Sequence, residues 1–299
     1  MPMSRRSVLA AIAALAAAPL RLSATGTPAT LTAGQVVERI KAAVGVDWQS
    51  QTVDRIGAGA PGTPVTGIAT TMGASLEVLR RAAADGLNMI IAHEPTFHDH
   101  FDDPDAFGED STVRHKRDFI ATNDMVVFRF HDHWHAMAPD GIGVGMAQAL
   151  GWQEYADPAR SGEFALPPTP LSRLADHLAG RLGAEAMRLM GDPALPVRRV
   201  ATAWGYADLE RLRAVAARSD VDLVIVGETR EWELVPYVAD QIAQGLPKAL
   251  VVLGHVASEQ AGMAYCAQWL RPLLGGTRVE FIAQREPLRG YRPGAALSD

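Results

Sequence analysis

Short apolar runs separated by helical segments restrict the fold of this chain more than any other feature of its sequence. Met125-Val126-Val127-Phe128 is one such run, and runs of this kind without polar alternation are typical of strands buried on both faces. Helical periodicity accompanies these runs, for example over residues 75–84 and 112–122. Strands that alternate with helices predict layered α/β sheets. We therefore expect an α/β fold with two similar halves, each a mixed sheet flanked by helices.

The two halves are separated by a stretch that is rich in proline. The first α/β half is expected over 31–153 and the second over 171–299. The segment 154–170 contains four prolines, which is typical of a surface connection. The alternative is that 31–299 forms one intertwined domain.

Apolar runs and their periodicity also place the individual elements. We expect strands at 65–71, 87–93, 125–131, 186–190, 198–204, 222–228, 248–255 and 278–284. We expect helices at 36–44, 75–84, 112–122, 144–150, 171–182, 207–218, 234–244 and 259–274. The capping-box pattern at Thr32–Gln35 marks the start of the first helix, and residues 57–64 are expected to form a turn-rich loop.

Residues 1–30 have the features of an export signal. Arg5-Arg6 precede a weakly apolar, alanine-rich run from Ala10 to Leu20. This run is too short to span a bilayer, and the arginine pair resembles a bacterial twin-arginine signal. We expect a periplasmic or secreted protein with no membrane association after signal removal. The alternative is an ordinary N-terminal helix with two surface arginines.

Composition and missing motifs exclude several classes of function. The chain has 28 Lys and Arg against 34 Asp and Glu, a net charge of −6, so the basic footprint of a nucleic-acid-binding protein is missing. Cys266 is the single cysteine, which excludes an internal disulfide and any Cys-cluster zinc or iron–sulfur site. The glycine patterns of dinucleotide enzymes, P-loop enzymes and serine hydrolases are also missing. A small molecule is therefore the expected partner.

Four of the expected strands end in side chains that can bind a metal ion. A single His or Glu at such a position is often only a solvated loop residue, but the carboxyl ends of strands in α/β sheets point into one crevice. Imidazole and carboxylate ligands suit a divalent transition metal such as Zn, Fe, Mn or Co. We therefore predict a metal site in the crevice between the halves. The strand ends are His93-Glu94, His131 with Asp132-His133-Trp134-His135 after it, Glu228, and His255 with Glu259 four residues later.

Three sequence blocks resemble the NIF-three-like dinuclear-metal-centre hexamer family, also labelled GTP cyclohydrolase type-two homologues. Ile90–Pro95 is similar to the family's Ile-x-His-His-Pro, and 131–151 is similar to its His-x-x-x-Asp with a later Leu-Gly helix end. Gly254–Glu259 is similar to its Gly-His-x-x-Ser/Thr-Glu, and Val226-Gly227-Glu228 to its Thr-Gly-Glu/Asp. The order of these blocks follows the family over about Thr32 to Leu288. The resemblance implies two divalent metal ions and a ring-shaped homohexamer.

The resemblance also implies a set of ligands, with two departures from the family pattern. Glu94 stands where the family has a second histidine, and His135 aligns with the family's aspartate. The departures compensate, because the set still has three histidines and two carboxylates. The alternatives are that Asp132 or His133 fills the aspartate position, that His131 is a further ligand, and that His98 and His100 lie on the adjacent loop. The implied ligands are His93, Glu94, His135, His255 and Glu259, with His131 as the additional candidate.

Two metal ions that share a water lower its pKa and polarise a phosphoryl or carbonyl oxygen. Glu259 is the expected bridging carboxylate, brought next to His255 by a strand-to-helix turn, with Ser258 as the N-cap of the helix that follows. Glu228 is the expected catalytic group, either as a general base or as the acceptor that orients a ligand histidine. A charge near a helix N-terminus is the alternative for Glu228.

Two functions fit these features. The first is a dinuclear metal-dependent hydrolase of an unknown small substrate, with a metal-activated water as the nucleophile. The second is an exported protein that binds, stores or delivers metal without turnover, which the surplus of histidines in 131–135 favours. A hexamer that uses metal only for stability is a third reading, and strand-end clusters that face an open crevice count against it.

Overall fold

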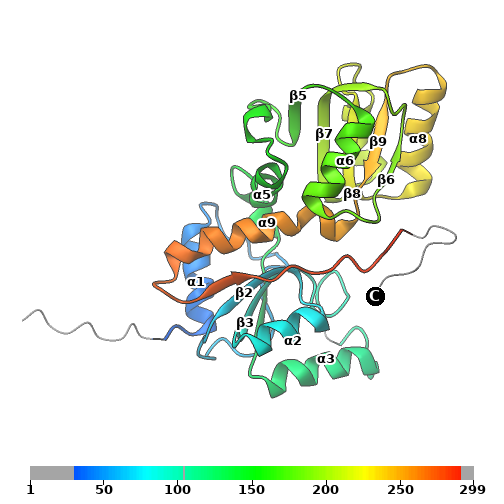
Figure 1. Cartoon of the computed structure of the whole chain (residues 1–299). Coiled ribbons are helices and arrows are strands. Elements are labelled where there is room, and N and C mark those ends of the chain that lie inside the picture. Colours follow the sequence, from blue (N-terminus) through cyan, green and yellow to red (C-terminus); the bar gives the residue numbers. More distant parts are fainter. Residues whose placement is uncertain (1–29, 104, 291–299) are drawn as a thin grey trace, which may run out of the picture.

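The computed structural model describes residues 30–103 and 105–290. The expected signal peptide lies outside these residues apart from Thr30. Within the described ranges, no helix is both long and apolar enough to cross a membrane. Each expected strand and helix has a counterpart in the structure, and two mixed five-stranded sheets form the framework (Figure 1).

The first sheet has the order β1-β4-β3-β2-β10. Strands β2 (Ile68–Gly73), β3 (Met89–Glu94), β4 (Val126–Arg129) and β10 (Val279–Phe281) are parallel, and β1 (Ile56–Ala58) runs antiparallel to β4 at one edge. Helices α2 (Leu76–Ala84) and α3 (Ser111–Thr122) cover one face, and α1 (Ala33–Ala43) lies on the other.

Successive residues of the central strands enter two different cores, as the unbroken apolar runs predict. Ile90 packs with the core beneath α2 and α3, whereas the neighbouring Met89 and Ile91 pack with the core beneath α1. All three side chains are fully buried. Burial on both faces therefore explains why these strands show no polar alternation.

The second sheet has the order β5-β7-β8-β9-β6. Strands β7 (Pro196–Tyr206), β8 (Leu223–Glu228) and β9 (Ala249–Val252) are parallel, while β5 (Glu163–Pro170) and β6 (Arg188–Met190) are antiparallel edge strands. Helices α7 (Leu209–Ala216) and α8 (Glu231–Ala243) pack on one face, and α6 (Leu171–Leu182) packs on the other.

The segment 154–170, which we expected to be only a connection, contributes an edge strand to this sheet. It overlaps a short 3₁₀ helix (Gln153–Tyr155) and ends in β5. Prolines lack the N–H that a central strand needs, but an edge strand has one unpaired side and tolerates them. The pairing of β5 with β7 is irregular between Ala165 and Thr169, where two prolines lie. The expected loop at 57–64 likewise begins inside the edge strand β1.

Helix α9 (His255–Leu270) lies between the two sheets and packs against elements of both (Figure 1). It crosses α5 (Gly141–Leu150) closely: a Cβ on Gly145 would overlap the backbone of Ala261, and one on Gly262 would overlap Ile142. After a 3₁₀ turn (Arg271–Leu273), the chain returns to the first sheet as β10. The first sheet is therefore assembled from both ends of the described chain, with α9 as the link between the sheets.

Candidate metal centre

The candidate ligands come from three places that the fold brings together. His93 and Glu94 are the last residues of β3. His131 and His135 follow β4 and belong to the turn and short helix α4 (Asp132–Ala136). His255 and Glu259 lie in the first turns of α9. Because β3 and β4 are parallel neighbours, their carboxyl ends meet at one edge of the sheet, and the start of α9 reaches the same place.

The expected strand-to-helix turn between His255 and Glu259 is wrong. Strand β9 ends at Val252, and α9 already begins at His255, so the two residues share one face of a helix. Gly254, with φ of 96°, turns the chain from the strand directly into the helix and is its N-cap. Ser258 is therefore not the N-cap; its hydroxyl donates to His255 O at 2.7 Å and accepts from Gly205 N at 3.1 Å.

The carboxylate of Glu259 faces ligand atoms on two sides. Its Oε2 lies 3.1 Å from His255 Nε2 and 3.5 Å from His93 Nε2, and its Oε1 lies 3.7 Å from His135 Nε2. Two ligands of one tetrahedral metal ion, each about 2.0–2.2 Å from it, are roughly 3.3–3.6 Å apart. Glu259 is 2% exposed. The spacing therefore fits a carboxylate that binds a metal ion together with these histidines.

His93 provides a direct test of whether the site fits a cation. Its Nδ1 donates to the carbonyl oxygen of Phe130 at 3.2 Å, which leaves an unprotonated Nε2 in the neutral ring. This Nε2 is buried, has no hydrogen-bond partner, and faces the Glu259 carboxylate. A lone pair opposite a carboxylate is unfavourable unless a proton or a metal ion lies between them. The residues present therefore fit a metal ion.

Two overlapping groups of described residues have donor atoms close enough to hold a metal ion. In each group, one ligand atom per residue lies within 4.8 Å of the others. His93 is common to both groups. The groups are His93, His131 and His135, and His93, Glu94 and Glu259.

Local charges set different protonation states for the histidines. Burial and the neighbouring imidazoles of His93 and His135 lower the pKa of His131 to about 4. Burial by itself lowers the pKa of His255, but three carboxylates around it raise that pKa to about 12. These are Glu228, Glu259 and Glu94. Without a metal ion, His255 thus carries the proton that balances the acids, and a bound cation would take over that role.

Each outer nitrogen of these histidines is held by an acceptor, as is usual for metal-ligating histidines. His255 Nδ1 donates to Glu228 Oε1 at 3.0 Å, and His135 Nδ1 donates to Asp140 Oδ1 at 3.2 Å. Of the roles expected for Glu228, the contact observed is the one that orients a ligand histidine. Asp140 was not anticipated, although its position before Gly141 is a typical helix N-cap, and it does cap α5.

The alternatives within 131–135 point elsewhere. One carboxylate oxygen of Asp132 accepts from Thr52 Oγ1 and Val53 N, at 2.9 and 3.1 Å, and the other lies 2.9 Å from Nδ1 of His131. His133 is bonded at both ring nitrogens and stacks on Trp48 with 3.7 Å between ring centroids. Neither residue belongs to the two ligand groups, whereas His131 and His135 both do. The two loop histidines, His98 and His100, are exposed and also lie outside those groups.

Two buried charged residues next to the ligands were missed by sequence reasoning. The Asp54 carboxylate accepts from three successive backbone N–H groups, at 2.6 Å from His131, 2.9 Å from Asp132 and 2.8 Å from His133, and from His133 Nδ1 at 2.7 Å. Arg129 Nε donates to His93 O, and its Nη2 lies 3.4 Å from Glu94 Oε2. No motif marks either residue: Asp54 is a lone acid before β1, and Arg129 sits within an apolar run.

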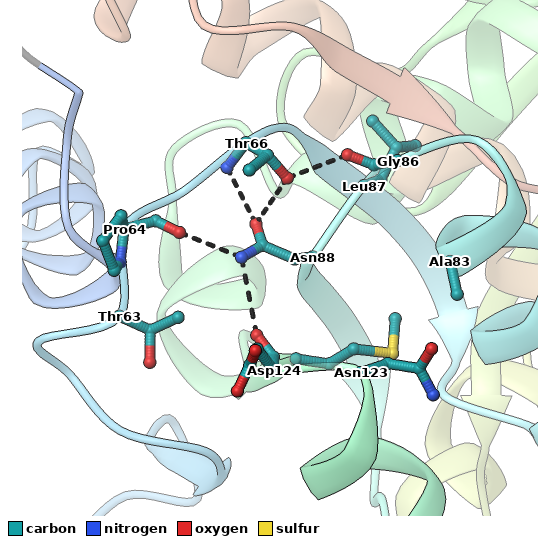
Figure 2. Close-up of a pocket in the computed structure, with 10 residues that line it drawn as sticks. Thr63, Pro64, Thr66, Ala83, Gly86, Leu87, Asn88, Asn123 and Asp124 are labelled. Atoms are coloured by element: carbon teal, nitrogen blue, oxygen red, sulfur yellow. Dashed lines mark hydrogen bonds between the residues drawn. The ribbon is translucent and has the colours of Figure 1, made fainter.

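The ligand groups open into a cavity of about 680 Å³. Its lining also includes Trp204 and Tyr206, from β7 of the second sheet, and Arg211, from α7. A second hollow, of about 630 Å³, lies at the other end of β3 and differs in character. Figure 2 shows the carboxamide of Asn88 there, bonded to Pro64 O and Thr66 N. This hollow has no cluster of titratable groups along its described lining, so the larger cavity is the candidate site.

Comparison with known proteins places this geometry in context. A family model described as Duf34/NIF3 (NGG1p interacting factor 3) matches residues 31–287. No curated protein matches the chain.

Solved structures share the fold at low sequence identity. Protein SA1388 of Staphylococcus aureus has a TM-score of 0.65 and 15% identity, over 88% of this chain and 100% of that one. Protein ybgI, of unknown function, has a TM-score of 0.64 and 23% identity, over 85% and 98%. A Bacillus cereus protein related to NIF3 has a TM-score of 0.63 and 14% identity, over 87% and 99%.

Proposed function

This chain belongs to the Duf34/NIF3 family, and from its site we propose that it is a hydrolase that uses two divalent metal ions on a small substrate. The position of Glu259 carries the proposal, because its carboxylate faces His93 and His255 with one oxygen and His135 with the other. The unpartnered Nε2 of His93 supports it. The donor set of imidazoles and carboxylates suits Zn, Fe, Mn or Co.

The proposal assigns the ligands to two positions that share Glu259. His93, Glu94, His255 and Glu259 Oε2 would hold one ion, and His131, His135 and Glu259 Oε1 would hold the other. Such ions polarise a carbonyl or phosphoryl oxygen and activate water.

The chain's own residues bind, orient and move protons around this centre. Glu228 holds Nδ1 of His255 and so fixes which ring nitrogen faces the ligand groups. Its side chain is half exposed and lines the cavity. The hydrogen bond from His255 lowers the pKa of Glu228, so the group is ionised at neutral pH. Glu228 is therefore placed to accept a proton from a substrate or water in the cavity.

Metal binding without turnover is the competing function. The two ligand groups share His93, and the site opens directly on a cavity of about 680 Å³ from which an ion can enter or leave. A protein that stores or delivers metal needs no substrate contacts beyond this. The hydrolase proposal accounts in addition for the proton acceptor Glu228 beside the ligands.

Elemental analysis and a turnover screen separate these functions. The protein is purified without a histidine tag, and its metal content is measured before and after chelation. Phosphoesters, cyclic amides and nucleotides are then screened with and without added metal. Glu259→Gln should lose bound metal and turnover, whereas His98→Ala, on the exposed loop, should lose neither. Turnover that survives complete chelation would contradict the proposal, and bound metal with no turnover over the panel would favour storage or delivery.

Export and assembly are proposed on separate grounds. The Arg5-Arg6 pair and the apolar run after it support twin-arginine export to the periplasm or beyond. The family resemblance supports a homohexamer. Cell fractionation of the wild type and an Arg5→Lys, Arg6→Lys variant tests export, and the mass of the purified protein in solution tests assembly.

A further inference from the structure

The cavity at the candidate metal centre is also lined by Arg211, from α7, and by Tyr206, from β7 of the second sheet. We propose that Arg211 and Tyr206 bind an anionic group of the substrate, a phosphate or a carboxylate. This inference rests on the proposed function, because it names the class of substrate that the same cavity takes.

Both residues lie where the parallel strands of the second sheet end. Tyr206 is the last residue of β7 and pairs in register with Glu228, the last residue of β8. Arg211 lies in the first turn of α7, whose N-cap is Asp208. Tyr206, Glu228 and Arg211 all line the cavity that His135 and Glu259 also line. The two sheets thus present their carboxyl edges to one cavity, which the candidate ligands and Arg211 both line.

The guanidinium of Arg211 is not committed to another group of the protein. Arg129, the other arginine that lines the cavity, bonds to the carbonyl of His93 and pairs with Glu94. Arg199 and Arg218 pair with acids that do not line the cavity. Among the residues that the structure describes, no acid or carbonyl pairs with the side chain of Arg211. It is therefore a cation with five donors in contact with the cavity.

Arg211 places a positive charge at the cavity that His135 and Glu259 also line. The acids around the cavity would be offset by bound cations, and Arg211 would then remain as excess positive charge. A guanidinium binds phosphate and carboxylate oxygens in a bidentate manner. An anionic group held there would fix the rest of a small substrate against the ligand side of the cavity.

Anion binding by matched variants tests the inference. Binding of inorganic phosphate and of acetate is measured by titration calorimetry on the metal-loaded and the metal-free protein. Arg211→Met removes the charge, and Arg213→Met, an exposed residue of the same helix that does not line the cavity, is the control. We expect Arg211→Met to weaken binding of the recognised anion roughly tenfold or more, and Arg213→Met to leave it unchanged. The anion whose binding falls more identifies the phosphate or carboxylate class.

The measurement separates this inference from the proposed function. If wild-type protein binds neither anion, or if Arg211→Met binds both as well as wild type, the inference is overturned. If elemental analysis finds no bound metal, the metal-dependent function fails on its own. The comparison of the metal-free variants still decides the role of Arg211 in that case.

Discussion

Replacing Asp54 with asparagine perturbs the centre without touching a candidate ligand. Asp54 is 5% exposed, and its two carboxylate oxygens accept four hydrogen bonds from the residues that begin α4. Asparagine has the same shape but only one acceptor oxygen. Whichever way its amide turns, an NH₂ group faces two N–H donors: the backbone groups of His131 and Asp132, or the backbone and ring of His133.

The magnitude follows from the number of bonds lost. A hydrogen bond to a charged acceptor contributes about 1.5–3 kcal/mol, so losing two predicts a fall of about 3–6 kcal/mol in the free energy of unfolding. Domains are stable by about 5–15 kcal/mol, so the variant should stay folded. Because α4 carries His135 and has His131 as its N-cap, its displacement should weaken metal binding by about 10- to 100-fold.

Urea unfolding and competition with a chromophoric chelator measure the two effects. Asp157→Asn is the control. Asp157 accepts a hydrogen bond from Arg199 at 2.7 Å and is not part of α4, so its replacement should leave metal affinity unchanged. An Asp54→Asn protein that binds metal as tightly as wild type would refute the reasoning that Asp54 positions the centre. Unchanged stability would refute the assigned hydrogen bonds themselves.

Two further substitutions test other parts of the site. Gly205→Ala should weaken metal binding roughly tenfold, because a Cβ there would overlap the Glu259 carboxylate. Gly183→Ala is the control: its φ is similarly positive, but no atom lies near the added Cβ, so it should lower stability without changing metal affinity. Equal metal affinity in the two variants would contradict the overlap. Burial lowers the pKa of Lys116 to about 8, so the folded state gives up this proton before the unfolded state does, and the free energy of unfolding should rise by up to about 3 kcal/mol between about pH 8 and pH 10.5. Lys116→Met should abolish that rise, as measured by denaturant unfolding curves at each pH. If the difference in stability between the two proteins does not vary with pH, burial does not lower the pKa of Lys116.

Elements with strong sequence signals were predictable, and short elements were not. Unbroken apolar runs located β3, β4 and β8 because these strands are buried on both faces. Helix α4 has only five residues, too few for periodicity to be visible. Without this helix, the sequence could not decide among the histidines of 131–135. In an extended chain, His131, His133 and His135 would share a face. The actual helix turn places only His131 and His135 together, because they are four residues apart.

Asp54 and Arg129, which contact the candidate ligands, could not be predicted for a different reason. Asp54 precedes His131 by 77 positions and Arg129 contacts the carbonyl of His93 across 36 positions, so neither contact leaves a local pattern. Such contacts depend on how strands β1, β3 and β4 are ordered in the sheet. Sequence patterns give the period of an element but not its neighbours. The candidate ligands at strand ends and the acceptor Glu228 could therefore be named from the sequence, whereas Asp54 and Arg129 could not.

The same neighbours explain how the two departures from the family motif fit into one centre. Glu94, in the position of a histidine, adds a negative charge beside the ligand groups, and Arg129 lies 3.4 Å from its Oε2 to offset that charge. Contacts with His255 and His93 lower the pKa of Glu94 to about 2, although burial alone would raise it. His135, in the position of an aspartate, removes a negative charge, and Asp140 restores one behind the imidazole at 3.2 Å. If the alignment implied by the family resemblance holds, the charge changed at each of these two positions is offset one contact further out, by Arg129 and by Asp140.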